Sequence, residues 1–312
     1  MRETMWRQPD DLRRLLDDRG PAERAAERIA GRRIFLSGTG TSWHAANHGA
    51  DLLRLAGLEA WAVQPDESVL HGPAAGEGDA LLLLSHRGTK LYTSEAVARA
   101  RAAGAATVQI SSIGAPGADI ETCAPETSPA FTASHLCAIL RLAQIASALG
   151  ADLGRLDDVP EAVAAELDDP ALDVPPPARL LQFVGSGTAA WVAAEGALKV
   201  RETAYVAAAG YSMEYLLHGP SVAIGGEDAL VVLDTGGPGQ ERLALVADTC
   251  AGHGAVVHRF RREALGEALS VFALTTIVQR IALEAAERLG TNPDTFGKDL
   301  PGRAEVWAAI PL

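Results

Sequence analysis

The sequence has few cysteines, a deficit of positive charge and no long apolar run. Its 312 residues include three cysteines, Cys123, Cys137 and Cys250, and no CxxC pair, which argues against a disulfide framework and against a zinc site. The longest purely apolar runs, such as Ala80–Leu84, are too short to cross a bilayer. The first residues contain no apolar signal core. We therefore expect a cytoplasmic protein that does not interact with a membrane.

Lysine and arginine total 27 against 40 aspartate and glutamate residues, so the formal net charge is −13. An acidic chain without a basic stripe repels nucleic acid, and we expect no nucleic-acid partner. An anionic ligand would have to be captured by local backbone amides and a few cations.

Short apolar runs alternate with longer helical patterns along the chain. Buried strands are predicted at Arg33–Leu36, Glu59–Val63, Ala80–Leu84, Thr107–Ile110, Leu180–Val184, Ala229–Leu233 and Val256–Phe260. Apolar strands separated by helices are typical of parallel sheets covered on both faces, so the predicted fold class is α/β. The helical patterns at Pro9–Gly31 and Phe131–Leu167 are predicted to pack on the outside.

A proline-rich stretch, VPPPARL, follows Asp173 and predicts a stiff linker. We therefore divide the chain into an N-terminal helical segment (residues 1–30), a first domain (31–172) and a second domain with a C-terminal tail (173–312). A faint internal repeat relates the two domains. Gly38–Ala50 aligns with Gly185–Ala197 at an offset of 147 residues, and each copy follows a strand and begins a helix. We interpret the repeat as a duplication.

The first glycine turn is a candidate anion site. Gly38, Gly40, Thr41 and Ser42 lie between a strand and a helix, where backbone amides and hydroxyls can bind an anion. The competing interpretation is a tight turn with Ser42 as a helix cap. The repeat places Gly185, Ser186 and Gly187 in the equivalent turn of the second domain. The glycine spacing does not match a dinucleotide-binding fingerprint.

A second loop carries cations and hydroxyls at the carboxyl end of a predicted strand. In parallel sheets this edge binds ligands, and arginine and lysine suit a phosphate. A solvated turn is the alternative. The candidate residues of this loop are Ser85, His86, Arg87, Thr89 and Lys90, arranged around Gly88.

The most informative segment is EGALKVRE, followed by HGP. Helical spacing places Glu195, Lys199 and Glu202 on one face of a helix whose other sides are apolar. A charged stripe on an otherwise buried helix is a candidate site. His218 of HGP follows, and a lone histidine is more often structural than catalytic.

Together, GTGTSWHAA, SHRGT, EGALKVRE and HGP resemble the isomerase half of the glucosamine-6-phosphate synthases and their SIS (sugar isomerase) domain relatives. The resemblance covers roughly residues 30–300. It implies two tandem flavodoxin-like SIS domains in a homodimer, active sites shared across the subunit interface and no cofactor.

The resemblance also implies roles for individual residues. It places phosphate contacts at Thr41, Ser42 and Ser85. Glu202 would move a proton between C1 and C2 of an open-chain phosphorylated sugar or amino sugar. His218 would assist ring opening, reaching in from the partner subunit, and Glu195 and Lys199 would line the same pocket.

Three departures from the family pattern bear on the activity. No glutaminase domain precedes the SIS pair, so we expect no glutaminase activity from this chain, and a separate glutaminase partner is left open. Arg87 and Lys90 stand where the family's second phosphate loop has a serine and a threonine. The tail lysine that forms a Schiff base in the synthases falls at about Pro301, which leaves Lys298 and Arg303 as displaced candidates.

The predicted function is a SIS enzyme that acts by C1/C2 proton transfer through an enediol or enolamine. Isomerase, aminotransferase-like, deaminase and fructosamine-type deglycase activities all remain open. The alternative is a non-catalytic sugar-phosphate sensor, which would not need Glu202 and His218.

Overall fold

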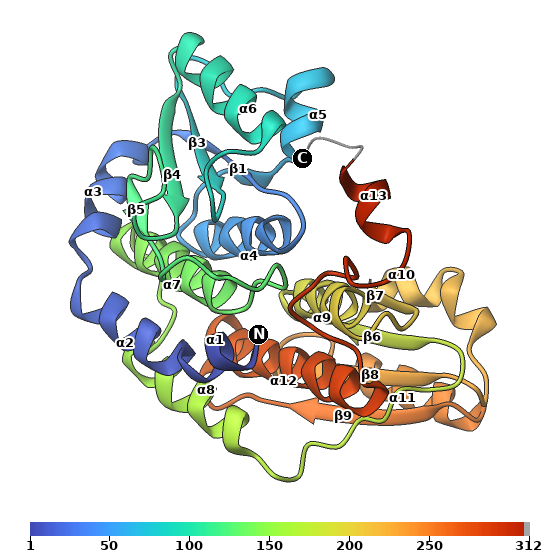
Figure 1. Ribbon diagram of the computed structural model, residues 1–312. Coiled ribbons are helices and arrows are strands. Elements are labelled where there is room, and N and C mark those ends of the chain that lie inside the picture. The colour runs from blue at the N-terminus through green and yellow to red at the C-terminus, as the bar shows by residue number, and fades with distance from the viewer. Residues whose placement is uncertain (309–312) are drawn as a thin grey trace. The chain divides into compact units, whose positions relative to one another are not determined.

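The computed structural model describes residues 1–308 and contains two fully parallel sheets flanked by helices (Figure 1). The five-stranded sheet has the order β2-β1-β3-β4-β5, with β1 Arg33–Ser37, β2 Ala60–Ala62, β3 Asp79–Leu84, β4 Ala106–Ser111 and β5 Ile120–Glu121. The four-stranded sheet has the order β7-β6-β8-β9, with β6 Leu181–Gly185, β7 Ala208–Ser212, β8 Ala229–Asp234 and β9 Val256–Arg261. The α/β prediction is confirmed.

Helices connect these strands and cover the sheets. They are α1 Arg2–Trp6, α2 Gln8–Asp17, α3 Gly20–Ile29, α4 Thr41–Leu55, α5 Pro65–Leu70, α6 Leu91–Ala102, α7 Ala133–Ala148, α8 Val159–Asp168, α9 Ala189–Thr203, α10 Met213–Leu217, α11 Gln240–Gly252, α12 Gly266–Leu289 and α13 Arg303–Ala308. Short 3₁₀ turns lie at Leu156–Asp158 and Pro220–Ala223.

The chain divides into two compact units. The first unit comprises Arg7–Thr127 and Phe131–Pro160 and contains the five-stranded sheet. The second unit comprises Met1–Trp6, Ser128–Ala130 and Glu161–Glu305 and contains the four-stranded sheet. The division falls near the start of α8, ahead of the 172–173 boundary drawn from the proline-rich stretch.

Successive strand residues in the first unit point to opposite faces of the sheet. Phe35 packs on the side of α6 in a cluster with Leu81 and Val97, whereas Leu36 faces Gly49 of α4. On the face of the sheet that carries Leu36, α7 packs against α4 and against the N-terminal helices α2 and α3. The expectation that the whole stretch Phe131–Leu167 packs on the outside is therefore wrong for α7, whose residues from Ala133 to Ala146 are all buried.

The second unit repeats this arrangement. Val184 belongs to a cluster with Leu243 and Val246 of α11, whereas Phe183, on the opposite face, meets Gly196 of α9. The adjoining α12 is long and apolar enough, by length and composition, to cross a membrane, but 83% of its apolar window is buried inside the protein. This burial is typical of the core helix of a soluble protein.

The predicted duplication agrees with the local geometry of the two units. A bidentate Arg33–Asp79 ion pair (3.0 Å for each bond) closes the start of β3, and Arg179 pairs with Asp228 in the same way before β8. In both units the carboxylate also accepts the backbone N–H of a glycine three residues earlier, at 2.9 Å and 2.8 Å. The Arg33 guanidinium lowers the pKa of Asp79.

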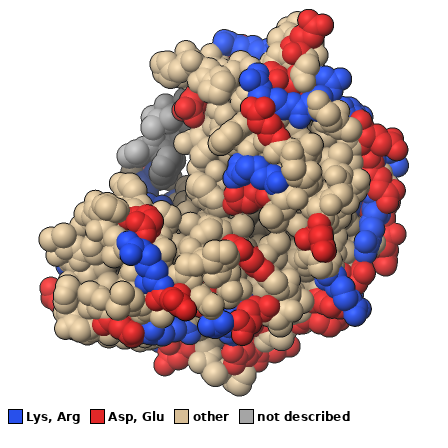
Figure 2. All heavy atoms as spheres, turned by 180° about the vertical axis from the view of Figure 1, so that it is seen from behind, with Lys and Arg blue, Asp and Glu red and all other residues tan. Residues whose placement is uncertain are grey.

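Charged side chains of both signs are mixed on the face of the molecule seen in Figure 2. On the face seen in Figure 2, Lys and Arg side chains are interspersed with Asp and Glu over the part of the chain that the structure describes. This mixed surface agrees with the acidic net charge of the sequence and gives no basic stripe on the face in view.

Candidate functional site

A pocket lies at the carboxyl edge of the first sheet. Its volume is about 330 Å³, including the part open to solvent. Its walls come from the start of α4, the ends of β3 and β4, the residues that follow β3 and β5, and α7 with the segment before it. The lining residues are Thr41, Ser42, Ala45, Leu84, Ser85, His86, Ile110, Ser111, Thr122, Phe131, Ser134, His135 and Ala138. The sheet order reverses between β1 and β3, and ligands of open α/β sheets bind in the crevice at such a switch point.

The first glycine turn brings Thr41 and Ser42 to this pocket. Gly40 adopts a positive φ of 59° directly before α4. At Gly38 an added β-carbon would lie 2.6 Å from the Ser42 carbonyl oxygen, so only glycine permits this tight return of the chain. Thr41 and Ser42, at the N-terminal end of α4, thus line the pocket, where the partial positive charge of the helix start favours an anion.

The loop after β3 contributes Ser85 and His86 to the pocket but not its cations. The Ser85 hydroxyl oxygen accepts the Gly88 backbone N–H at 3.1 Å and closes the loop. Arg87, Thr89 and Lys90 are exposed and lie outside the residues that line the pocket. Hydroxyl and imidazole groups, rather than cations, therefore form this wall.

His86 is held in one tautomer. Its Nε2 atom accepts the backbone N–H of Glu126 at 2.9 Å, which places the proton of the neutral ring on Nδ1. Burial lowers the pKa of His86, assisted by the positive charge of Arg87 and opposed by Glu126. Nδ1 is buried and has no hydrogen-bond partner among the described residues. A neutral histidine with an unused N–H donor therefore lines the pocket.

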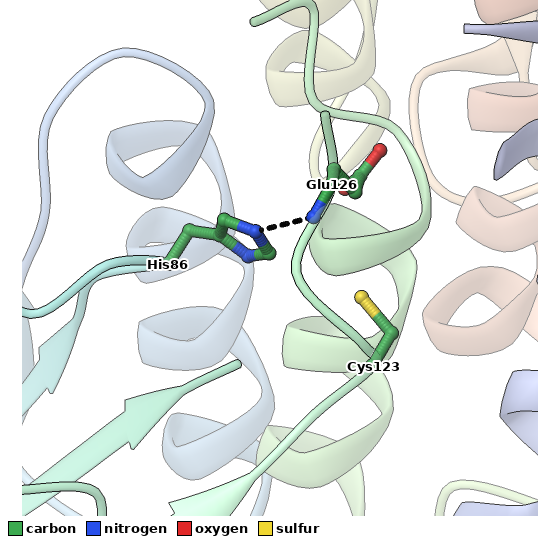
Figure 3. A group of neighbouring side chains, drawn as sticks. All are labelled: His86, Cys123 and Glu126. Atoms are coloured by element: carbon green, nitrogen blue, oxygen red, sulfur yellow. Dashed lines mark hydrogen bonds between the residues drawn. The ribbon is translucent and has the colours of Figure 1, made fainter. Parts of the chain in front are cut away.

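His86, Cys123 and Glu126 also form a cluster of potential metal ligands (Figure 3). One ligand atom from each lies within 4.8 Å of the others. However, the Nε2 lone pair is already used, and the Glu126 carboxylate accepts the N–H groups of Thr132 (3.0 Å) and Ser134 (2.8 Å) at the start of α7. We therefore interpret the cluster as a hydrogen-bonded support for the His86 loop rather than as a metal centre.

Sequence reasoning missed the contribution of α7 to the pocket. Ser134 and His135 of this helix line it, together with Ser111 at the end of β4 and Thr122 after β5. His135 is 2% exposed, and its ring centroid lies 6.3 Å from that of His48. The available signal was that α7 is largely apolar, a pattern typical of buried helices, with Ser134 and His135 among its few polar residues.

In the second unit, α9 brings Glu195, Lys199 and Glu202 together, as their helical spacing predicts. The Lys199 ammonium lies 2.6 Å from Glu202 Oε2 and 3.5 Å from Glu195 Oε1. The Lys199 and Glu195 side chains are 1% and 0% exposed, whereas that of Glu202 is 14% exposed. Glu202 is thus the accessible end of a buried charged group, and Lys199 lies beneath it.

His218 is 79% exposed at the end of α10, and its Nε2 lies 3.6 Å from Glu214. No contact joins it to Glu195, Lys199 or Glu202 among the ion pairs of the described residues. The HGP histidine is therefore presented to the surface of its own unit.

The tail residues lie near the end of α9. Lys298 is exposed. The Arg303 guanidinium lies over the Tyr205 ring, 5.4 Å from its centroid. The Tyr205 hydroxyl accepts the Gly297 N–H at 2.8 Å, so the tail is tied to the chain three residues beyond Glu202.

Comparison with known proteins confirms the resemblance to SIS domains. Residues 29–133 match the model of the SIS domain. This part of the chain is therefore a SIS domain. The chain is similar to the glutamine–fructose-6-phosphate aminotransferase (isomerizing) of Chlorobaculum tepidum, with 26% identity over 270 residues. The match covers 75% of this chain but 44% of that relative, so the chain spans less than half the length of the relative.

Solved structures share the fold. A glucosamine-6-phosphate deaminase from Thermotoga maritima has a TM-score of 0.80 at 18% identity, and the match covers 94% of this chain and 96% of that structure's chain. The tagatose-6-phosphate ketose/aldose isomerase of Escherichia coli has a TM-score of 0.74 at 19% identity, covering 94% and 92%. At these identities the likeness shows the fold alone.

Proposed function

We propose that this chain is an enzyme that binds a phosphorylated ketose or amino sugar and transfers a proton between C1 and C2 through an enediol or enolamine. The observation that carries the proposal is the group of Glu195, Lys199 and Glu202 on α9. The buried Lys199 ammonium contacts the Glu202 carboxylate, whose side chain is 14% exposed at the edge of the core. Burial of two ionisable groups, Glu195 and Lys199, is costly to stability, which favours a functional reason for keeping them.

In the proposed reaction Glu202 is the base. Its carboxylate takes the proton from one of the two carbons and returns it to the other, while the hydroxyl proton of the first carbon passes to the oxygen or nitrogen on the second. Lys199 is a positioning residue: its ammonium fixes the Glu202 carboxylate by a 2.6 Å contact and balances its charge. His218 is proposed to assist ring opening.

The proposed phosphate site is the pocket of the first unit. Support comes from the N-terminal end of α4, the hydroxyls of Thr41, Ser42 and Ser85, and the unused Nδ1–H of His86. These groups are neutral donors of the kind that hold a dianion without a cation. Arg87 and Lys90 could add charge only from outside the pocket lining.

The decisive experiment measures exchange of substrate protons with solvent deuterium. Glu202→Gln keeps the shape of the side chain but removes the base, so exchange at C1 or C2 of fructose 6-phosphate or glucosamine 6-phosphate should vanish while affinity stays within about tenfold. Glu241→Gln, at an exposed carboxylate in the first turn of α11, is the matched control. Equal losses of affinity and exchange would make Glu202 a binding residue and overturn its role as the base.

The products formed in the same incubations separate the activities that remain open. An isomerase converts ketose to aldose, a deaminase releases ammonia from an amino sugar, and a fructosamine-type deglycase releases an amine. Tight binding of the sugar phosphates by the wild-type chain without any exchange would instead indicate a sensor.

We further propose that both sheets belong to tandem flavodoxin-like SIS domains in a cytoplasmic homodimer. The strand orders support the first part, since both sheets place their first strand between the second and the third. We propose that the apolar stretch Tyr205–Leu217 lies at the subunit contact. Within it, Tyr215 is 66% exposed and suits such a contact, whereas Met213 is buried in the core of its own unit.

Subunit mixing tests the shared site. If each site combines Glu202 of one chain with His218 of its partner, a mixed dimer of Glu202→Gln and His218→Ala carries one intact site, and partial activity returns. If every chain supplies both residues to its own site, no activity returns at any mixing ratio.

A further inference from the structure

The second unit contains a copy of the edge that forms the pocket in the first unit. Both sheets reverse their order between the first strand and the third, so both have a switch point where a ligand could bind. The glycine turns also match. Gly40 and Gly187, 147 residues apart, have φ angles of 59° and 55°. The glycine turn at the switch point therefore has a similar backbone conformation in both units.

The strand registers identify equivalent side chains at this edge. Ile34 pairs with Ala80 in the first sheet, and Leu181, which is 147 residues after Ile34, pairs with Ala229 in the second. Five residues further along each third strand, Ser85 and Asp234 occupy the same position. Asp234 Oδ1 accepts the Gly236 N–H at 2.8 Å, much as Ser85 accepts that of Gly88. The second copy thus replaces a pocket-lining hydroxyl with a carboxylate.

A second carboxylate, that of Glu267, fills the space between the glycine turn after β6 and the loop after β8. An added β-carbon at Gly187 would lie 2.6 Å from Glu267 Oε1, and one at Gly237 would lie within 2.9 Å of both carboxylate oxygens. Glu267 is in the first turn of α12 and therefore reaches both glycine loops at once. The loops also touch each other, because the Ser186 hydroxyl donates to the Pro238 carbonyl at 3.2 Å.

Helix packing shows which residue of the first unit corresponds to Glu267. Gly49 meets Leu142 of α7, and Gly196 meets Val278 of α12, so these two helices occupy the same place in their units. Eleven residues before Leu142 is Phe131, which lines the first pocket, and eleven residues before Val278 is Glu267. An apolar wall residue of the first copy corresponds to an anion in the second.

We propose that Glu267, together with Asp234, closes the second copy of the anion cradle and restricts a phosphorylated ligand to one site per chain, that of the first unit. The inference rests on the proposed function for the location of the first site. The Glu267 carboxylate takes the space beside the glycine loops that a phosphate would need, and both carboxylates repel an anion.

The test counts binding sites by calorimetric titration with inorganic phosphate and with glucosamine 6-phosphate. The wild-type chain should bind one equivalent. The double variant Asp234→Ser, Glu267→Ala should gain a second site at least tenfold tighter than any second binding by the wild type. Glu241→Ala, which also removes one negative charge of the second unit, is the control and should gain no site.

The design separates this inference from the proposed function. Replacing Ser42 and Ser85 with alanine in the double variant removes the first site, and one equivalent should still bind. If the wild type binds no phosphate but the double variant binds one, the first-unit site is wrong and the role of Glu267 stands. Two equivalents on the wild type would overturn the role of Glu267. A double variant that folds but gains no second binding site would also overturn the role of Glu267. If the double variant fails to fold, Asp234→Ser and Glu267→Gln are titrated singly, and the absence of any second binding in both would equally refute it.

Discussion

Removing the Lys199 charge tests whether α9 carries a coupled ionic group. The ammonium contacts both Glu202 and Glu195, and its own side chain is 1% exposed. Lys199→Met keeps the length and most of the volume but leaves two carboxylates near each other, one of them fully buried. Breaking a buried ion pair by removing one partner typically costs about 3–5 kcal/mol.

This magnitude sets the size of the measurable effect. At roughly 2–4 °C per kcal/mol for a domain of this size, the thermal midpoint of Lys199→Met should fall by roughly 6–20 °C. Lys298→Met is the matched control, since Lys298 is exposed in the same unit, and its midpoint should stay within about 2 °C of the wild type.

A second substitution isolates the cause. In the Lys199→Met background, Glu195→Gln removes the deeper of the two uncompensated charges and should recover at least about 1 kcal/mol. Urea denaturation of the four corners of this double-mutant cycle gives the coupling energy directly. The reasoning is refuted if Lys199→Met unfolds within about 1 kcal/mol of the wild type, or if Glu195→Gln destabilises both backgrounds equally.

Three further predictions concern packing, pH and ligand binding. Gly196→Ala should destabilise the protein by about 1–3 kcal/mol, because its β-carbon would lie 2.9 Å from Phe183, whereas Gly252→Ala in α11 meets nothing within 4 Å and should not; urea midpoints decide. Burial lowers the pKa of His86, so the unfolded chain takes up the proton first and stability should fall as pH drops below about 6.5; His86→Asn should flatten this slope, and an unchanged slope would contradict it. Arg87→Ala should weaken binding of a phosphorylated sugar by less than about 1 kcal/mol, because Arg87 is exposed and lies outside the pocket lining; a loss of ~1.5–3 kcal/mol confined to the phosphorylated sugar in calorimetric titration would instead show a direct phosphate contact.

The sequence was sufficient to locate most of the sheet and the charged stripe. Apolar runs followed by glycine turns or helical patterns mark β1, β3, β6 and β8, because a strand buried on both faces must be apolar throughout. Glu195, Lys199 and Glu202 were assigned to one face because helical geometry alone places residues four and seven apart side by side.

The elements that were missed depend on tertiary structure. The strand β7 consists of Ala208–Ser212, and its alanines and glycine have little intrinsic preference for a strand. It forms because β6 and α9 pair with it and cover it; an added β-carbon at Gly210 would lie 2.3 Å from the Ala193 carbonyl oxygen. The position of His135 in the pocket was not predicted for a similar reason. The burial of α7 depends on the helices that pack around it.

The two copies of the repeat have diverged in opposite directions, and this divergence suggests a division of roles. In the first copy the switch point carries hydroxyls, while the positions of α4 equivalent to Lys199 and Glu202 are apolar, Leu52 and Leu55. In the second copy the switch point carries carboxylates, while α9 carries the buried ionic group. In a unit that kept both properties, a bound phosphate would share the unit with two carboxylates, those equivalent to Glu195 and Glu202, and their repulsion would weaken binding. The neutral donors and these carboxylates instead lie in different units. This distribution supports the proposal that the first unit binds the anion and that the second carries the proton-transfer carboxylate.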